Sequence, residues 1–275
     1  MNQASSQSAR RTRALVESAV MISLATVLSI FKLAELPYGG SITLASMLPI
    51  LLVAYRHGAA FGFGAGIVYG IVQQLLGLKN LSYFTTWQSI VAIILLDYLV
   101  AFGVIGVASL FRRLRDSRTA LLLGGLAASL LRYVCHVISG ATVWAGLSIP
   151  TEAALAYSFI YNATYMIPET IVLLLMLGFL SSALDFRAEI PKRIAANGGA
   201  APLYFLFSGL SLLAALVFDT VSVFQTMQDP ESGEFTLAYL GNVDFMVVGI
   251  VSGVLFAASL LLFLLGIRSR RRKGH

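Results

Sequence analysis

Apolar residues run in long, nearly unbroken stretches along most of the chain, and short polar segments separate them. Most stretches approach the roughly 20 residues that an α-helix needs to cross a bilayer. Inside lipid every backbone polar group must be satisfied within its own segment, so the stretches should be helical. The pattern predicts eight spans, at about residues 14–33, 42–55, 59–78, 84–111, 120–139, 153–180, 202–218 and 243–267. The second is short and contains Pro49, so it should be tilted or partly buried.

Composition supports the same fold class. The 275 residues are 58% hydrophobic and 12% charged, whereas a soluble domain is about 25% charged. We therefore expect an all-α polytopic membrane protein with no sizeable soluble domain. The basic start followed by an apolar run could be mistaken for a signal peptide, but the run is too long and no clear cleavage site follows. The single cysteine, Cys135, allows no internal disulfide and is expected to serve packing.

Basic residues alternate between the two predicted sides of the membrane. If the N-terminus is cytoplasmic, all of the 19 Lys and Arg residues except Lys32, Lys79 and Arg132 fall in inner segments. This asymmetry follows the positive-inside rule and predicts that both termini are cytoplasmic. The net charge of +6 is therefore interpreted as a signal of topology and of contact with membrane lipid, and not of nucleic-acid binding.

Common catalytic motifs are absent from the sequence. It has no Gly-Lys dipeptide and hence no P-loop, and it has no H-E-x-x-H, C-x-x-C or G-x-S-x-G. The three histidines, His57, His136 and His275, are too far apart to suggest a metal site. No enzyme of familiar mechanism, no cofactor and no metal is predicted.

The stretch RYVCHVISGATVW places polar and aromatic groups in one line. Arg132, His136, Gly140 and Trp144 are each four residues apart, so they share one face of a helix. Polar groups inside a membrane are costly and usually face a cavity or one another. Taken singly, Trp144 could be an interfacial anchor and His136 could bond a neighbouring helix.

Two other predicted spans carry matching groups near their outer ends. Asp97 and Tyr98 lie in the fourth span, and Tyr157, Tyr161 and Asn162 lie in the sixth. Asn162 alone would more often bond another helix than a ligand. Together the groups predict a pocket with one acid, one histidine, one amide and several aromatic rings. Such a pocket suits a flat, cationic, nitrogen-rich molecule.

Arg132 and Glu169 are predicted to lie deeper in the membrane than these groups. The fifth span runs outward and the sixth inward, so the rise of ~1.5 Å per residue brings both side chains to a similar depth. An unpaired charge at that depth is costly. We expect an ion pair that closes the floor of the pocket; the alternatives are that Arg132 pairs with Asp97 or that Glu169 faces a water cavity.

These residues resemble those of the thiamine-specific substrate-binding subunits (S-components) of energy-coupling factor transporters. The resemblance covers about residues 14–183. It rests on the PYGGSIT loop from Pro37, the LDYLVAF stretch from Leu96, the series His136, Gly140 and Trp144, and the AYSFIYN stretch ending at Asn162. Some family members have Glu in place of Asp97 and a tryptophan in place of Gly40.

The resemblance implies a function and its residues. Thiamine would bind to Asp97, Tyr98, His136, Gly140, Trp144, Tyr157 and Asn162. Trp144 would stack on a ring, and Asp97 would balance the positive charge or accept from the amino group. His136 and Asn162 would hydrogen-bond the pyrimidine, and Gly140 would leave room for a ring. The implied partners are a membrane scaffold subunit and two ATPase subunits, with docking through Ala19 and Ser23 of the first helix.

The expected organisation has five parts: a tail (1–13), a six-helix core (14–183), an inner linker (184–201), two added helices with an outer loop (202–267) and a basic tail (268–275). Two alternatives to thiamine uptake remain at this point. The core could bind a thiamine precursor or another vitamin, or the chain could be a membrane enzyme or scaffold.

Overall fold

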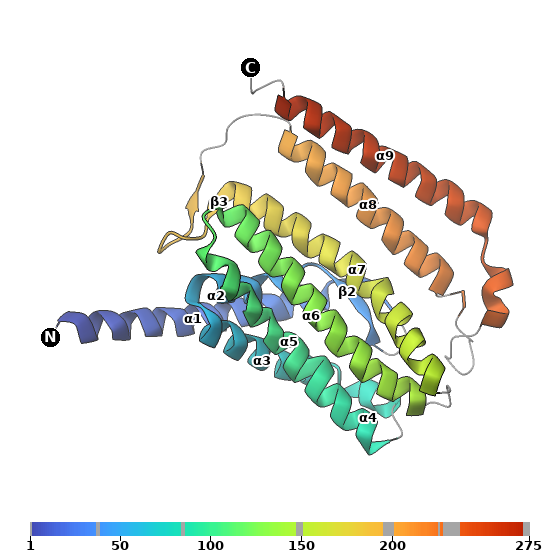
Figure 1. Cartoon of the computed structure of the whole chain (residues 1–275), viewed down its shortest axis with the longest axis horizontal. Helices are drawn as coiled ribbons and strands as arrows, with labels where there is room; N and C mark the ends of the chain where they lie inside the picture. The colour runs from blue at the N-terminus through green and yellow to red at the C-terminus, as the bar shows by residue number, and fades with distance from the viewer. Residues whose placement is uncertain are drawn as a thin grey trace.

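The computed structural model describes residues 2–36, 39–83, 86–146, 151–194, 201–224, 226–227 and 237–271. It is a bundle of long helices (Figure 1). Within these residues, seven helices are long and apolar enough to cross a membrane. The multi-span helical fold predicted from the sequence is therefore confirmed, with one span fewer than expected.

The long helices are α1 (Asn2–Ile30), α3 (Ala59–Leu76), α6 (Ser117–Gly146), α7 (Thr151–Ala183), α8 (Ala201–Phe224) and α9 (Phe245–Arg271). A seventh span is continuous through α4 (Trp87–Ala92), η3 (Ile93–Val100), α5 (Ala101–Gly103) and η4 (Val104–Arg113). The short elements are β1 (Lys32–Glu35), β2 (Ser41–Thr43), α2 (Leu48–His57), η2 (Leu78–Tyr83), β3 (Leu184–Asp185), β4 (Lys192–Arg193) and η5 (Leu237–Asn242).

The predicted second span is wrong as a crossing helix. Residues 41–43 form β2, which pairs antiparallel with β1, and α2 that follows has ten residues. At ~1.5 Å per residue, α2 covers only about half of a hydrocarbon core of ~30 Å. All residues from Leu48 to Tyr55 are buried, so this stretch is apolar because protein surrounds it. The first helix likewise ends at Ile30, and the chain continues as β1.

Small residues let the span formed by α4, η3, α5 and η4 approach α3 closely. A Cβ at Gly66 would lie 2.2 Å from the Phe102 carbonyl oxygen, and one at Gly70 would lie 2.5 Å from the Tyr98 carbonyl oxygen. A glycine every four residues keeps one face of α3 free of side chains. Opposite this face, η3 winds with the wider hydrogen-bonding pattern of a π-helix, which is rare and concentrates at functional sites. It contains Asp97 and Tyr98.

The helices α8 and α9 form an added pair on one side of the bundle (Figure 1). Leu175 of α7 fills the space beside Gly209 of α8, and the Thr220 hydroxyl donates to the Thr164 carbonyl of α7 at 3.2 Å. The α8–α9 contact combines hydroxyl groups with aromatic packing: Ser208 Oγ lies 2.8 Å from the Ser259 carbonyl oxygen, and the Phe205 and Phe263 ring centroids are 5.6 Å apart. Most of the apolar side chains of α9 face outward.

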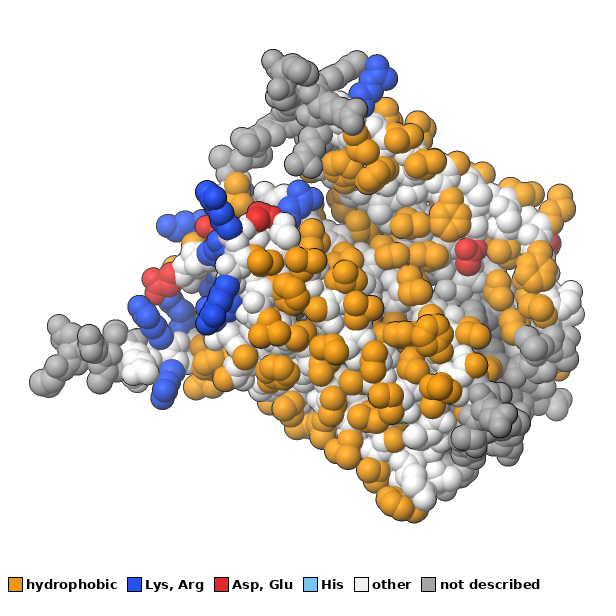
Figure 2. Space-filling model, viewed as in Figure 1, with side chains coloured by type: hydrophobic (Ala, Val, Ile, Leu, Met, Phe, Trp, Pro, Cys, Tyr) orange, Lys and Arg blue, Asp and Glu red, His pale blue; other side chains and the backbone are white. Residues whose placement is uncertain are grey.

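Basic side chains gather at one end of the bundle, while hydrophobic side chains cover the visible flank (Figure 2). This end holds the start of α1, the end of α2, the end of η4 and the β3–β4 segment, which meet around a shared cavity. Four of the five segments that charge placement predicts to be inner therefore come together; the described part of the C-terminal basic tail is not part of this cavity. The predicted linker 184–201 begins as the β3–β4 pair; residues 195–200 lie outside the described residues.

Candidate binding site

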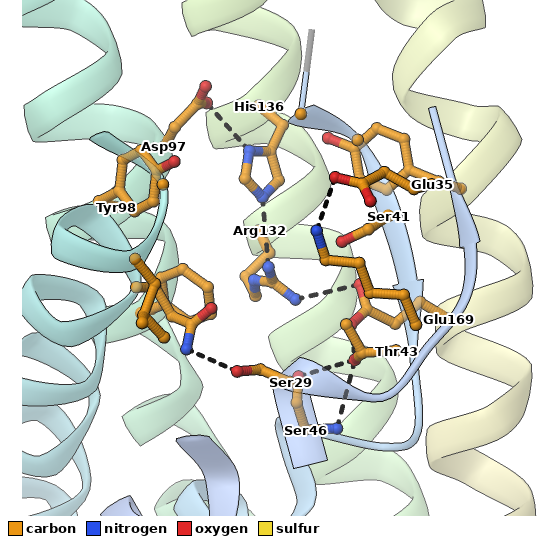
Figure 3. A pocket seen from close by; sticks show the side chains of 18 of the residues that line it. Ser29, Glu35, Ser41, Thr43, Ser46, Asp97, Tyr98, Arg132, His136 and Glu169 are labelled. Atoms are coloured by element: carbon orange, nitrogen blue, oxygen red, sulfur yellow. Dashed lines mark hydrogen bonds and ion pairs between the residues drawn. The ribbon is translucent and has the colours of Figure 1, made fainter. Parts of the chain in front are cut away.

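A cavity of about 480 Å³ lies among β1, β2, α3, η3, α6 and α7. Its wall combines charged, hydroxyl and aromatic side chains, several of which point toward one another in Figure 3. Of the predicted site residues, the structure places Asp97, Tyr98, His136, Gly140 and Asn162 in this lining. Three separate predicted spans thus contribute to one cavity.

A line of charged and polar groups crosses the cavity (Figure 3). The Asp97 carboxylate lies 2.9 Å from His136 Nδ1, and His136 Nε2 lies 3.4 Å from an Arg132 guanidinium nitrogen. Arg132 in turn lies 3.6 Å from the Glu169 carboxylate. The two inner groups of this line are the donors: Arg132 can donate to His136, and His136 can donate to Asp97, so the four side chains orient one another.

The chemistry of Arg132 fixes the tautomer of His136. A guanidinium only donates hydrogen bonds, so His136 Nε2 must accept from Arg132. The proton of the neutral imidazole then sits on Nδ1 and is donated to Asp97. The other oxygen of the Asp97 carboxylate remains available to a ligand, and Asp97 is about a quarter exposed.

The predicted ion pair of Arg132 and Glu169 is confirmed. Both side chains are about 95% buried, and their separation of 3.6 Å is well inside the ~6 Å limit of a pair. Arg132 does not pair directly with Asp97, because His136 stands between them. The guanidinium also lies 4.5 Å from the centre of the Phe102 ring, a favourable cation–π distance.

Glu169 is held by the segment between β2 and α2. The Thr43 hydroxyl donates to Glu169 at 2.8 Å and lies 2.8 Å from the Ser46 hydroxyl. Within this turn Ala45 adopts a positive φ of 54°, which is uncommon for a residue with a Cβ. The floor of the cavity is therefore built jointly by α6, α7 and a tightly folded turn.

Asn162 is occupied by protein groups. Its amide nitrogen donates to the Ser158 and His136 carbonyls at 2.8 and 3.2 Å, and its oxygen accepts from the Tyr165 hydroxyl at 2.5 Å. In this arrangement Asn162 joins α6 to α7, which agrees with the expectation that an asparagine in a span more often bonds another helix than a ligand. A ligand would have to displace one of these bonds to use the amide N–H groups.

Gly140 serves close packing of α6 and α7. A Cβ added to it would lie 2.3 Å from Ser158 Oγ and 3.1 Å from the Asn162 amide nitrogen. The space beside this glycine is thus filled by α7. The expectation that Gly140 leaves room for a ligand ring is wrong for this arrangement, although the residue does line the cavity.

Two predicted residues remain, Tyr157 and Trp144. Tyr157 is half-buried and packs against the core, but it is absent from the residues that line the cavity. Trp144 belongs to α6, and its side chain lies outside the described residues.

Sequence reasoning placed Tyr161 among the pocket groups but missed Tyr165, which packs beside it on α7. The Tyr161 hydroxyl accepts from the Gly40 backbone N–H at 3.2 Å, and the Tyr165 ring packs beside it with centroids 5.8 Å apart. A Cβ at Gly40 would lie within 3.0 Å of both side chains. The spacing of four residues, continued from Tyr161 and Tyr165 to Glu169, is the signal that could have revealed this face.

An ion pair stands at the β1 end of the cavity. Lys32 Nζ lies 2.7 Å from the Glu35 carboxylate, and both side chains are exposed. The Lys32 hydrogen bond lowers the pKa of Glu35, so this carboxylate stays ionised at neutral pH. Lys79 also lines the cavity.

Metal-binding clusters are not found: the described residues contain no group of three His, Cys, Asp or Glu side chains suited to a metal ion.

The two residues predicted for docking lie on the outer face of α1. Ala19 and Ser23 are exposed, whereas Ser18, Ala25 and Ser29 on the opposite face are buried against the bundle. Internal packing therefore uses a different set of small residues. The exposed set stays available to another helix.

The fold and the cavity together define a class: a polytopic helical membrane protein that encloses a polar, partly aromatic binding pocket between its helices. The model of the family described as thiamine transporter protein (Thia_YuaJ) matches residues 15–187. The chain belongs to this family, and it is a multi-pass protein of the cell membrane.

Individual relatives agree with this assignment. The chain is 36% identical over 178 residues to the thiamine transporter ThiT of Bacillus subtilis (strain 168), over 60% of this chain and 88% of the relative. It is 27% identical over 157 residues to the thiamine transporter ThiT of Lacticaseibacillus paracasei, over 53% and 72%. The solved structure of ThiT from Listeria monocytogenes has the same fold, with a TM-score of 0.52 at 21% identity over 62% of this chain and 94% of that chain.

Proposed function

We propose that the chain is the thiamine-binding S-component of an ATP-driven energy-coupling factor transporter. The observation that carries this proposal is the cavity itself: in a member of this family, a carboxylate that is about a quarter exposed and several aromatic rings meet inside a membrane bundle. Thiamine is a permanent cation with two flat rings, which such a wall suits.

Each residue has a proposed role. Asp97, oriented by His136, balances the thiazolium charge or accepts from the amino group of the pyrimidine. Tyr98 presents a ring to the cavity, and Trp144 stacks on a ligand ring. Tyr157 and Asn162 would join the ligand only after a rearrangement, since the first lies outside the lining and the second is bonded to protein.

Uptake requires partners that supply energy. The proposed partners are a membrane scaffold subunit and two ATPase subunits, and the exposed Ala19 and Ser23 of α1 are the proposed docking contact. The chain itself would bind and release thiamine without catalysing a reaction. In this arrangement the basic end of the bundle and both termini are cytoplasmic, and residues 14–183 form the binding core.

Tryptophan fluorescence of the purified protein tests the proposal. The chain has two tryptophans, Trp87 and Trp144, so thiamine should quench the Trp144 signal with submicromolar affinity. The Trp87→Phe variant should keep the quenching and Trp144→Phe should lose it. If a thiamine precursor quenches where thiamine does not, the ligand is a different one; if neither binds and the protein turns over a substrate, the transport proposal fails.

A further inference from the structure

The basic end of the bundle encloses a second cavity of about 880 Å³, separate from the proposed thiamine site. It lies between the start of α1, the end of α2, the end of η4 and the β3–β4 segment. Six arginines line it, against one carboxylate: Arg10, Arg11, Arg13, Arg56, Arg112, Arg187 and Glu189.

Half of these arginines are fixed by protein acceptors. Arg56 pairs with Glu17 and donates to the Phe186 and Ala188 carbonyls at 2.7 and 3.1 Å. Arg187 donates to the Arg115 carbonyl at 2.9 Å, and Arg13 pairs with Glu189. These bonds hold the walls of the cavity together. Every side-chain nitrogen of Arg56 and of Arg187 donates to a protein acceptor, whereas Arg13 uses one nitrogen.

The other three arginines have no acid partner among the described residues. No carboxylate of the described chain forms an ion pair with Arg10, Arg11 or Arg112. Arg112 donates to the Arg56 carbonyl at 3.3 Å, and one of its nitrogens lies 2.7 Å from the position of a Cβ on Gly58. That contact places Arg112 over the α2–α3 turn, so its guanidinium is positioned and still able to donate.

An apolar groove adjoins this cavity along α1. It is lined by Ser8, Ala9, Thr12, Arg13, Val16, Glu17 and Val20, and it shares Arg13 with the basic cavity. Val16 and Val20 are exposed, although they belong to a candidate membrane span. A cationic cavity beside an exposed apolar groove matches an amphiphile better than a free anion.

We propose that this cavity binds the phosphate headgroup of an anionic phospholipid, with an acyl chain lying in the groove on α1. Arg10, Arg11 and Arg112 would donate to the phosphate oxygens, because guanidinium groups bind phosphate with strong charge-assisted hydrogen bonds. Basic pockets between helices at the inner membrane surface are a recurrent setting for such headgroups. The bound lipid would tie α1 to the end of α2 and η4.

Native mass spectrometry of the full chain in a neutral detergent tests this. Dioleoylphosphatidylglycerol, dioleoylphosphatidylcholine and glycerol 1-phosphate are titrated separately. The anionic lipid should bind as a single resolved adduct, and the other two should bind far more weakly. The triple variant Arg10→Gln, Arg11→Gln, Arg112→Gln should weaken binding of the anionic lipid roughly 100-fold, because each arginine near an anionic membrane surface adds to the affinity.

A matched control variant distinguishes binding at this cavity from nonspecific attraction of the lipid to positive charge. Arg113, Arg115 and Arg193 are exposed and lie at the same end, but they do not line the cavity; their triple Gln variant removes equal charge and should retain tight binding. Equal losses in both variants, or equal binding of the two lipids, would overturn the proposal. Equal binding of glycerol 1-phosphate would mean a soluble phosphate site, which also overturns it. Unchanged circular dichroism of each variant confirms that the helices persist.

Discussion

The six-helix core and the α8–α9 pair differ in the polar contacts that join their helices. In the core, buried charges cross the space between helices, with Asp97, His136, Arg132 and Glu169 in one line. In the added pair, hydroxyl groups of Ser208, Ser211 and Ser259 make the contacts. Charged side chains are far more costly than hydroxyl groups inside a membrane. The concentration of charged side chains in the core therefore indicates that the functional site lies there.

No described residue of α8 or α9 lines the cavity. The pair meets the core mainly through α7, and within the pair Asp219 of α8 accepts from the Ser252 hydroxyl of α9. The comparison therefore predicts that changes in the core affect binding and stability strongly, and that equivalent changes in the added pair do not.

The largest effect should come from breaking the buried ion pair. Arg132→Met or Glu169→Gln leaves one uncompensated charge, which costs about 3–5 kcal/mol of the free energy of unfolding. The double variant should recover much of that loss, because both charges are then gone. Thermal or denaturant unfolding in detergent measures the cycle. Strictly additive losses would show that the two side chains are not coupled.

The next effect concerns the ligand. Asp97→Asn should weaken thiamine binding roughly 100-fold, since a hydrogen bond or ion pair to a charged group contributes about 1.5–3 kcal/mol. A charge-neutral thiamine analogue should lose less, and the fold should persist. The matched control is Asp219→Asn in α8, which should leave the dissociation constant unchanged. An equal loss for both ligands would exclude Asp97 as the counter-charge.

Much of this arrangement could be predicted from the sequence, because it follows from local patterns. Apolar length predicts the seven long helices, and helical spacing with antiparallel chain direction predicts the contact of Arg132 and Glu169, confirmed at 3.6 Å. The assignment of residues 42–55 as a span was wrong, since apolarity does not distinguish a segment buried in protein from one facing lipid.

Other contacts between distant segments could not be predicted. Nothing near Gly140 in sequence indicates that Ser158 fills the adjacent space, and nothing near Glu169 indicates that Thr43 donates to it. The π-helical winding at Asp97 is also invisible, because it depends on the packing against α3. These features are set by three-dimensional packing between segments that are far apart in the chain.

A smaller effect is expected in the added pair. Ser208→Ala or Ser259→Ala should cost about 0.6 kcal/mol each, the average for a hydrogen bond between membrane helices. Unfolding in detergent, compared with the Arg132→Met variant, measures the difference. A loss as large as that of the core pair would mean that the added helices are not the weaker interface.

The smallest effect should follow removal of the pair altogether. A chain ending at residue 200 should bind thiamine with an unchanged dissociation constant, because the cavity lining comes from residues 29–169. Titration of the truncated protein, with its helical content checked by circular dichroism, measures this. A folded but non-binding product would indicate that α8 supports the site, for instance through its contact with β1.

The central claim is that thiamine binds in the core cavity between η3, α6 and α7. An experimental structure of the full chain with thiamine bound tests it most directly. The account predicts ligand density within hydrogen-bonding distance of Asp97 and against Tyr98, with the Arg132–Glu169 pair intact beneath it. Density placed instead against α8 or α9, or an empty core cavity at saturating thiamine, would contradict it.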